Sequence, residues 1–65
     1  MEWKEPVNDY IIMFWIEPSE TGFVVTATRS DGATAEMEFE MLPHKDDVAV
    51  MFLSTPEFRK MVEME

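Results

Sequence analysis

The sequence predicts a small α+β domain, in which a three-stranded antiparallel meander carries one or two C-terminal helices on one face. Residues 33–41 alternate strictly between apolar and polar side chains, which is typical of a half-buried strand. Residues 23–29 are rich in β-branched types, which favour strands. Thr55-Pro56-Glu57 is a typical helix start, with a capping hydroxyl, a proline and an acid. At 65 residues, the chain forms one domain, residues 1–65.

Side-chain parity predicts the register of the hairpin between residues 23–29 and 33–41. A two-residue loop would place the three glutamates of the second strand on the apolar face. A three-residue loop, with Gly32 in the left-handed conformation, instead pairs Arg29 with Ala33 and gathers the apolar side chains on one face. Because a shift of one residue exchanges the two faces completely, we expect the second register.

A first strand is expected from Val7 to Glu17, followed by a turn at residues 18–21. Pairing Glu17 with Gly22 places its apolar side chains on the same face as those of the hairpin. The expected core face consists of Tyr10, Ile12, Phe14, Ile16, Phe23, Val25, Met37 and Phe39. The opposite face of the first strand then presents Ile11, Met13 and Trp15. These side chains are either exposed, which would mark an interface, or covered by the N-terminal segment that contains Trp3.

The C-terminal third of the chain must cover the core face. Phe58, Met61 and Val62 form an apolar stripe on a helix that begins after Thr55 and ends near Glu65. The segment Val48 to Leu53 allows two interpretations, a short helix capped by Asp46-Asp47 or a fourth strand. Methionines 37, 51 and 61 are expected on buried faces, where their flexible side chains fill gaps.

Composition excludes several classes of protein. There is no cysteine, so neither disulfides nor thiolate zinc sites stabilise the fold. Fourteen acids against five bases give a net charge of -9, which disfavours direct binding to nucleic acid or to an anionic membrane. The first six residues lack the features of a signal peptide, and the longest apolar run, residues 10–16, is too short to span a membrane. A cytoplasmic protein is therefore expected.

No catalytic or cofactor motif is present. The single histidine, His44, lies near Asp46 and Asp47, but a closed metal site needs about four donors, and acids at a helix start are common. Gly22 and Gly32 are isolated and form no phosphate-binding loop. We therefore expect no enzyme, no catalytic residue, no metal and no cofactor.

Negative charge on the outer face of the meander is the most informative feature. Glu36, Glu38 and Glu40 stand on one side of one strand, where successive side chains lie about 6.6–6.8 Å apart. Successive phosphates of a DNA strand advance about 3.4 Å along the axis, and their winding path roughly doubles that step. The row is either a functional surface or only the solvated half of an alternating strand. The candidate partner-binding residues are Glu36, Glu38, Glu40, Glu17, Glu20, Asp31, Trp15 and Met13.

In size, charge, lack of cysteine and its Glu36-Glu38-Glu40 row, the chain resembles small acidic phage-encoded anti-CRISPR proteins that mimic DNA. The resemblance covers the whole chain but includes no specific motif. It implies a protein that acts in the host cell cytoplasm, docks on the basic DNA-binding channel of a CRISPR effector complex and keeps target DNA out. The alternative is a small structural or adaptor subunit that docks through the Ile11-Met13-Trp15 face. In either case we expect a monomer or a weak homodimer.

Overall fold

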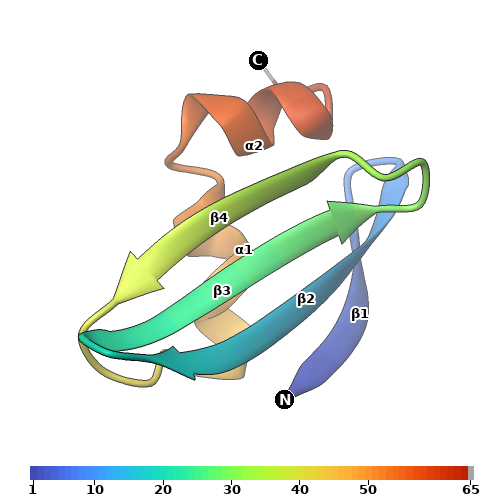
Figure 1. The fold of residues 1–65 in the computed structure, drawn as a ribbon. Helices are drawn as coiled ribbons and strands as arrows, with labels where there is room; N and C mark the ends of the chain where they lie inside the picture. The colour runs from blue at the N-terminus through green and yellow to red at the C-terminus, as the bar shows by residue number, and fades with distance from the viewer. Residues whose placement is uncertain (65) are drawn as a thin grey trace.

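The computed structural model describes residues 1–64, and it contains a four-stranded antiparallel sheet with two short helices packed on one face (Figure 1). The elements are β1 (Glu2–Val7), β2 (Tyr10–Ser19), β3 (Gly22–Arg29), β4 (Thr34–Phe39), α1 (Lys45–Phe52) and α2 (Pro56–Met61). The strands lie in the order of the sequence, β1-β2-β3-β4. The α+β class and the meander are confirmed, but the sheet has four strands rather than the three expected.

The additional strand is β1, at the N-terminal edge of the sheet. The first strand was expected to begin at Val7, but Asn8 and Asp9 form a turn there, and Asn8 adopts a φ of 55°. Asparagine tolerates this left-handed conformation better than most residues. Pro6 argues against a central strand, but it is compatible with an edge strand, which does not need every backbone N–H.

The hairpin between β3 and β4 has the predicted register. Phe23 lies opposite Phe39, and Val25 lies opposite Met37. The Arg29 N–H donates to the Ala33 carbonyl at 2.8 Å and closes a three-residue loop. Gly32 occupies this loop with a φ of 98°, the positive backbone angle that was expected for it.

The pairing of β2 with β3 differs from the prediction by two residues. Glu17 lies opposite Val24 instead of Gly22, because β2 continues through Pro18 and Ser19 to a tighter turn. A shift of two residues preserves the parity of side chains, so the apolar residues still share one face. The predicted core face is therefore right, although the turn was placed too early.

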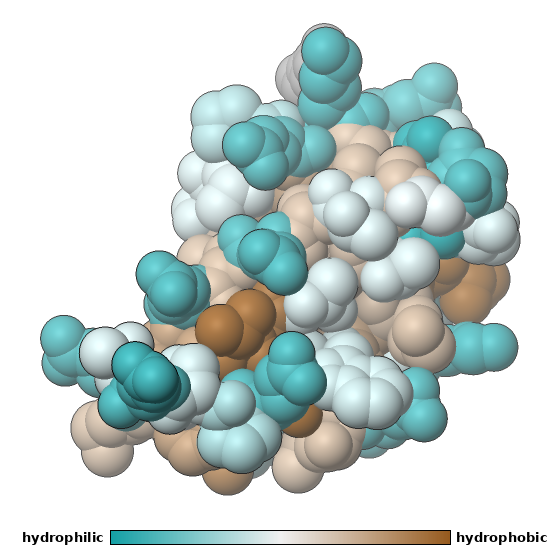
Figure 2. Space-filling model, viewed as in Figure 1, coloured by the Kyte–Doolittle hydropathy of each residue, from teal (hydrophilic) through white to brown (hydrophobic). Residues whose placement is uncertain are grey.

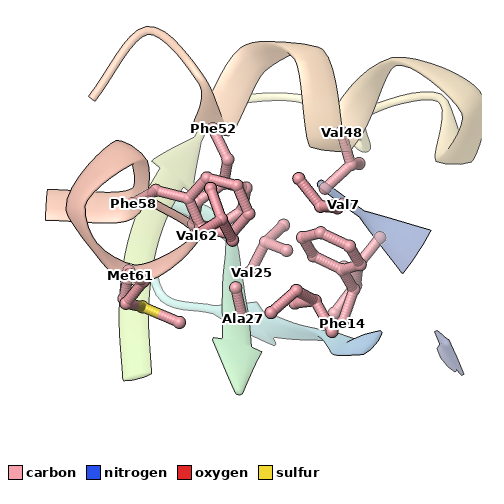
Figure 3. Packing of buried hydrophobic residues seen from close by; sticks show 12 residues of the cluster. Val7, Phe14, Val25, Ala27, Val48, Phe52, Phe58, Met61 and Val62 are labelled. Atoms are coloured by element: carbon pink, nitrogen blue, oxygen red, sulfur yellow. The ribbon is translucent and has the colours of Figure 1, made fainter. Parts of the chain in front are cut away.

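The core lies between this face and the two helices, and Figure 3 shows its packing. Phe14 from the sheet meets Phe52 and Phe58 from the helices, with ring centroids 5.1–6.1 Å apart. All three side chains are fully buried. The other buried residues are Val7, Ile12, Ile16, Val25, Ala27, Ala35, Val48, Met61 and Val62. Four of the predicted core residues, Tyr10, Phe23, Met37 and Phe39, are only partly buried and pack at its margin.

The segment from Val48 to Leu53, for which a helix and a strand were both possible, lies in helix α1 up to Phe52. Its cap is His44, whose Nδ1 accepts the Asp46 N–H at 3.2 Å, so the predicted caps Asp46 and Asp47 occupy the first turn instead. That position still suits them, because an acid near a helix N-terminus faces the positive end of the helix dipole. Met51 was expected to be buried, but it points outward and is 41% exposed.

Helix α2 begins as predicted. The Thr55 hydroxyl accepts the Phe58 N–H at 3.3 Å, and Pro56 is the first helical residue. The expected apolar stripe is buried as a unit, with Phe58 and Val62 fully inaccessible. The helix ends at Met61 rather than near Glu65, which lies outside the described residues. Across residues 1–64, neither helix is long and apolar enough to cross a membrane.

Candidate protein-binding surface

The outer face of the sheet, on the side away from the helices, brings most of the predicted site residues together. In Figure 1 this face is turned toward the viewer, with α1 behind it. The register aligns Glu2, Trp15, Thr26 and Glu36 in one row across the four strands. In the next row, Glu17, Val24 and Glu38 are neighbours, and Met13 belongs to the row on the other side.

One half of this outer face is acidic. It carries Glu2 and Glu17 from β1 and β2, together with Glu36, Glu38 and Glu40 from β4 and the residue beyond it, and Glu20 lies in the turn at the end of β2 beside them. All six side chains are exposed. Among residues 1–64 the charged pair is Arg29 with Asp31, and the His44 ring lies 3.8 Å from the Asp46 carboxylate, so none of the six acids has a cationic partner. We call these six residues the acidic half.

Most of the basic side chains lie away from the acidic half. Within residues 1–64, Lys4 is the basic residue that the strand register places on the outer face, opposite Met13. Lys45 lies over the Trp3 ring at 5.6 Å on the helical side, and Arg59 donates to the Leu53 carbonyl at 2.9 Å. The cations therefore stabilise the helical layer, while the acidic half stays unneutralised.

The other half of the outer face is apolar. Ile11 is 58% exposed and Trp15 is 44% exposed, while Met13 is partly covered. Figure 2 shows this face with hydrophobic surface visible between hydrophilic side chains. An open depression of about 270 Å³ lies here, lined by Lys4, Ile11, Met13, Thr28, Arg29 and Ser30.

Trp3 does not cover this apolar half. It lies on the opposite face, where its ring stacks on Phe14 with centroids 5.4 Å apart and its Nε1–H donates to Glu5 at 2.9 Å. Strand β1 lies beside β2 in the sheet rather than over it. Of the two interpretations that the sequence allowed, the exposed one is therefore confirmed.

Asp31 is separated from the other predicted site residues. It lies in the β3–β4 loop, at the opposite end of the sheet from Glu20 and Glu40, and its carboxylate accepts both Arg29 Nε–H and an Arg29 terminal N–H at 2.8 and 2.6 Å. This fork, together with the Ala33 N–H, lowers the pKa of Asp31 to about 2. Asp31 thus takes part in an ion pair with Arg29 that stabilises the fold.

The Arg29 side chain connects the sheet to the C-terminal end of α2. It lies over the Tyr10 ring at 5.2 Å and donates to the Met61 carbonyl at 2.6 Å. The Tyr10 hydroxyl donates to Glu63 at 2.8 Å, and this bond to a carboxylate raises the pKa of the phenol. These contacts place the cation at the carbonyl end of the helix, where the helix dipole favours positive charge.

Two residues of the outer face, Glu2 and Lys4, were not among the predicted site residues because β1 was not expected. Their signal was the Asn8-Asp9 pair, which commonly forms turns, preceded by polar residues at positions 2 and 4 that alternate with Trp3. Pro6 obscured this pattern.

Within residues 1–64 no group of three His, Asp or Glu side chains is placed to hold a metal ion. A second open depression, of about 210 Å³, is lined by Thr21, Glu38, Phe39 and Glu40. The outer face thus displays carboxylates beside exposed apolar side chains on one sheet. Comparisons with protein-family models, curated proteins and solved structures found no match for this chain.

Proposed function

We propose that this protein is an inhibitor that binds the basic DNA-binding surface of a CRISPR effector complex or of another DNA-binding protein, through acidic mimicry of DNA phosphates. The observation that carries the proposal is the acidic half of the outer face, whose six carboxylates lack cationic partners among residues 1–64. A mixture of acidic and basic side chains on this face would serve solubility equally well, so solubility alone does not explain a face that carries unpaired acids.

The spacing of the carboxylates supports the same function. Glu36 and Glu38 lie two residues apart on β4 and point to the same side, which sets them about 6.6–6.8 Å apart. Glu17 and Glu38 are separated by one intervening strand, or about 9.6 Å across the sheet. Lysine and arginine clusters that track a phosphate backbone can engage such an array in place of DNA.

A second candidate function, a structural or adaptor subunit, is favoured by the exposure of Ile11 and Trp15. An apolar docking face of this kind marks many interfaces. The two functions differ in their dependence on salt. Binding through carboxylates weakens steeply as salt rises, because charges in solvent are screened, whereas apolar contacts tolerate salt.

A competition assay tests the proposal. Guide-loaded CRISPR effector complexes of several types, and unrelated DNA-binding proteins, are incubated with labelled duplex DNA, and the protein is titrated in at several salt concentrations. We expect the wild type to displace DNA from at least one target and to lose potency as salt rises. The triple variant E36Q/E38Q/E40Q should lose at least 100-fold in potency, since charge-assisted hydrogen bonds contribute about 1.5–3 kcal/mol each.

The matched control is D46N/D47N/E57Q, which removes the same charge from exposed positions on the helical side. This variant should inhibit almost as well as the wild type. Equal losses in both variants would mean that only net charge matters, and the proposed surface would be wrong. Normal binding by E36Q/E38Q/E40Q, together with lost binding by W15A, would replace the mimic with the adaptor.

A further inference from the structure

We propose that Trp15 is a docking platform for an arginine side chain of the basic protein partner, with Glu2 and Glu17 as the carboxylates that receive its N–H groups. This inference rests on the proposed function, because it assumes a basic partner, and it names the partner residue that the outer face recognises. It also gives the exposed apolar half and the acidic half a common role, since Trp15 lies at their boundary.

The backbone pairing brings Glu2 close to Trp15. Met1 and Ile16 exchange two hydrogen bonds, from the Ile16 N–H to the Met1 carbonyl at 2.8 Å and from the Met1 amine to the Ile16 carbonyl at 3.2 Å. The next pair, Glu2 and Trp15, is therefore a non-hydrogen-bonded pair, in which Cα atoms approach to about 4.5 Å and side chains lie closest. Glu17 projects from the same strand face two residues further on, at about 6.6–6.8 Å.

The Trp15 ring has no aromatic or cationic partner among residues 1–64. The aromatic pairs involve Trp3, Phe14, Phe52 and Phe58, and the two cations near rings lie over Tyr10 and Trp3. At 44% exposure, Trp15 keeps much of its indole open to solvent. Lys4 does not fill this role, since it lies opposite Met13 and makes no ion pair with Glu2.

The chain already contains the arrangement that we infer for the complex. Arg29 lies over the Tyr10 ring at 5.2 Å while its guanidinium forks onto Asp31. The outer face presents the same two elements, an aromatic ring and neighbouring carboxylates, without the guanidinium. Arginine fits this site better than lysine, because its planar group stacks on a ring and donates in a fixed fork.

Charge complementarity favours a cationic partner over a second copy of this chain as the occupant. A two-fold dimer through the outer face would bring together two copies of one surface that carries unneutralised carboxylates on both sides. The like charges would then oppose association at the moment that apolar contact favours it. A cationic partner gains from both features at once.

The test uses hexa-arginine and hexa-lysine peptides as probes, with binding followed by calorimetry and by the emission of Trp15. The variant W3F leaves Trp15 as the only tryptophan, and it keeps an aromatic ring against Phe14. We expect hexa-arginine to change the emission of Trp15 and to bind about fivefold more tightly than hexa-lysine. W15L should remove that preference, and E2Q/E17Q should weaken the binding of hexa-arginine more than D46N/D47N does.

The outcomes separate this inference from the proposed function. If the two peptides bind equally and W15L changes nothing, the arginine platform is wrong, while inhibition that depends on Glu36, Glu38 and Glu40 in the competition assay would still support mimicry. If neither peptide binds at low salt and no DNA is displaced, both proposals fail. Dimerisation that rises with concentration and is lost in W15L would also overturn the platform, because a second copy would then occupy it.

Discussion

Replacing Gly22 with alanine should destabilise the protein strongly, because the end of β4 packs directly against this glycine. Gly22 begins β3 with a φ of 151°, which side-chain-bearing residues rarely adopt. An added Cβ would overlap the Phe39 carbonyl oxygen and lie 2.9 Å from the Glu40 Cα. Both neighbours are backbone atoms, so no rotation of a side chain relieves the contact. The strand end that carries Glu40 must move away instead.

The expected loss is about 2–3 kcal/mol, the upper part of the range for a residue forced into a disfavoured backbone region, because the overlap with backbone atoms adds to the conformational cost. A domain of this length has a total free energy of unfolding of about 3–10 kcal/mol. Since 1 kcal/mol shifts the melting temperature of such a domain by about 4–8 °C, the Gly22→Ala variant should melt about 8–24 °C below the wild type. Thermal unfolding followed by circular dichroism measures the difference.

Gly32→Ala is the matched control. Gly32 has a φ of 98°, but open space surrounds the position of its absent Cβ. This variant therefore suffers only the backbone cost, about 1–2 kcal/mol, and Gly32→Asn should suffer less because asparagine tolerates left-handed conformations. A Gly22→Ala variant that melts with the wild type, or above Gly32→Ala, would refute the close packing of β4 on Gly22.

Two further predictions concern charge and stability. The Asp31 carboxyl, with its pKa lowered to about 2 by Arg29 and the Ala33 N–H, stabilises the fold fully above its ordinary pKa near 3.8 and loses that effect as the pH falls toward 2. The Asp31→Asn variant should therefore differ most from the wild type at neutral pH and converge with it between about pH 4 and 2. Parallel melting curves across that range would contradict the role given to the fork. The melting temperature of the wild type should rise between about 0.01 and 0.1 M salt, where the Debye length falls from about 30 to 10 Å, and E36Q/E38Q/E40Q should show a smaller rise. A flat response in the wild type would mean that the acids do not repel one another.

Much of the fold was predictable because side-chain parity constrains strands so strongly. The strict alternation over residues 33–41 admits one register with buried apolar groups, and that register is observed. Parity also tolerates errors of two residues, and for this reason the core face was right although Glu17 pairs with Val24. The end of a strand is less constrained, since residues such as Pro18 and Ser19 fit either a turn or an exposed edge.

Strand β1 and the helix cap could not be derived in the same way. β1 contains only six residues, one of them proline, and it becomes stable through pairing with β2 rather than through its own composition. The cap at His44 depends on how the preceding turn approaches α1, and Asp46 and Asp47 offered equally good local signals. In both cases the tertiary context decides between alternatives that are close in local free energy.

The part of the candidate site that lies on a single strand could be predicted from the sequence. Glu36 and Glu38 share a face by parity alone, and their exposure was correctly expected. Asp31 was predicted as a site residue but lies apart from the others. Its contact with Arg29 depends on the geometry of a loop, which the sequence does not specify. Glu2 was missed because its position beside Trp15 depends on long-range pairing between strands.

The buried core and the surface proposed for recognition lie on opposite faces of the sheet, and this separation makes the proposed variants interpretable. The fully buried aromatic side chains lie between the sheet and the helices, and four of the five lysines and arginines lie on or beside the helical layer or its margin with the sheet. The outer face contributes the backbone pairing of its strands, while its carboxylates extend into solvent without intramolecular cations among residues 1–64. Exposed substitutions away from structural contacts usually change stability by less than about 0.5 kcal/mol. Loss of binding in E36Q/E38Q/E40Q or W15L, with a melting temperature that does not fall, would therefore report on recognition alone.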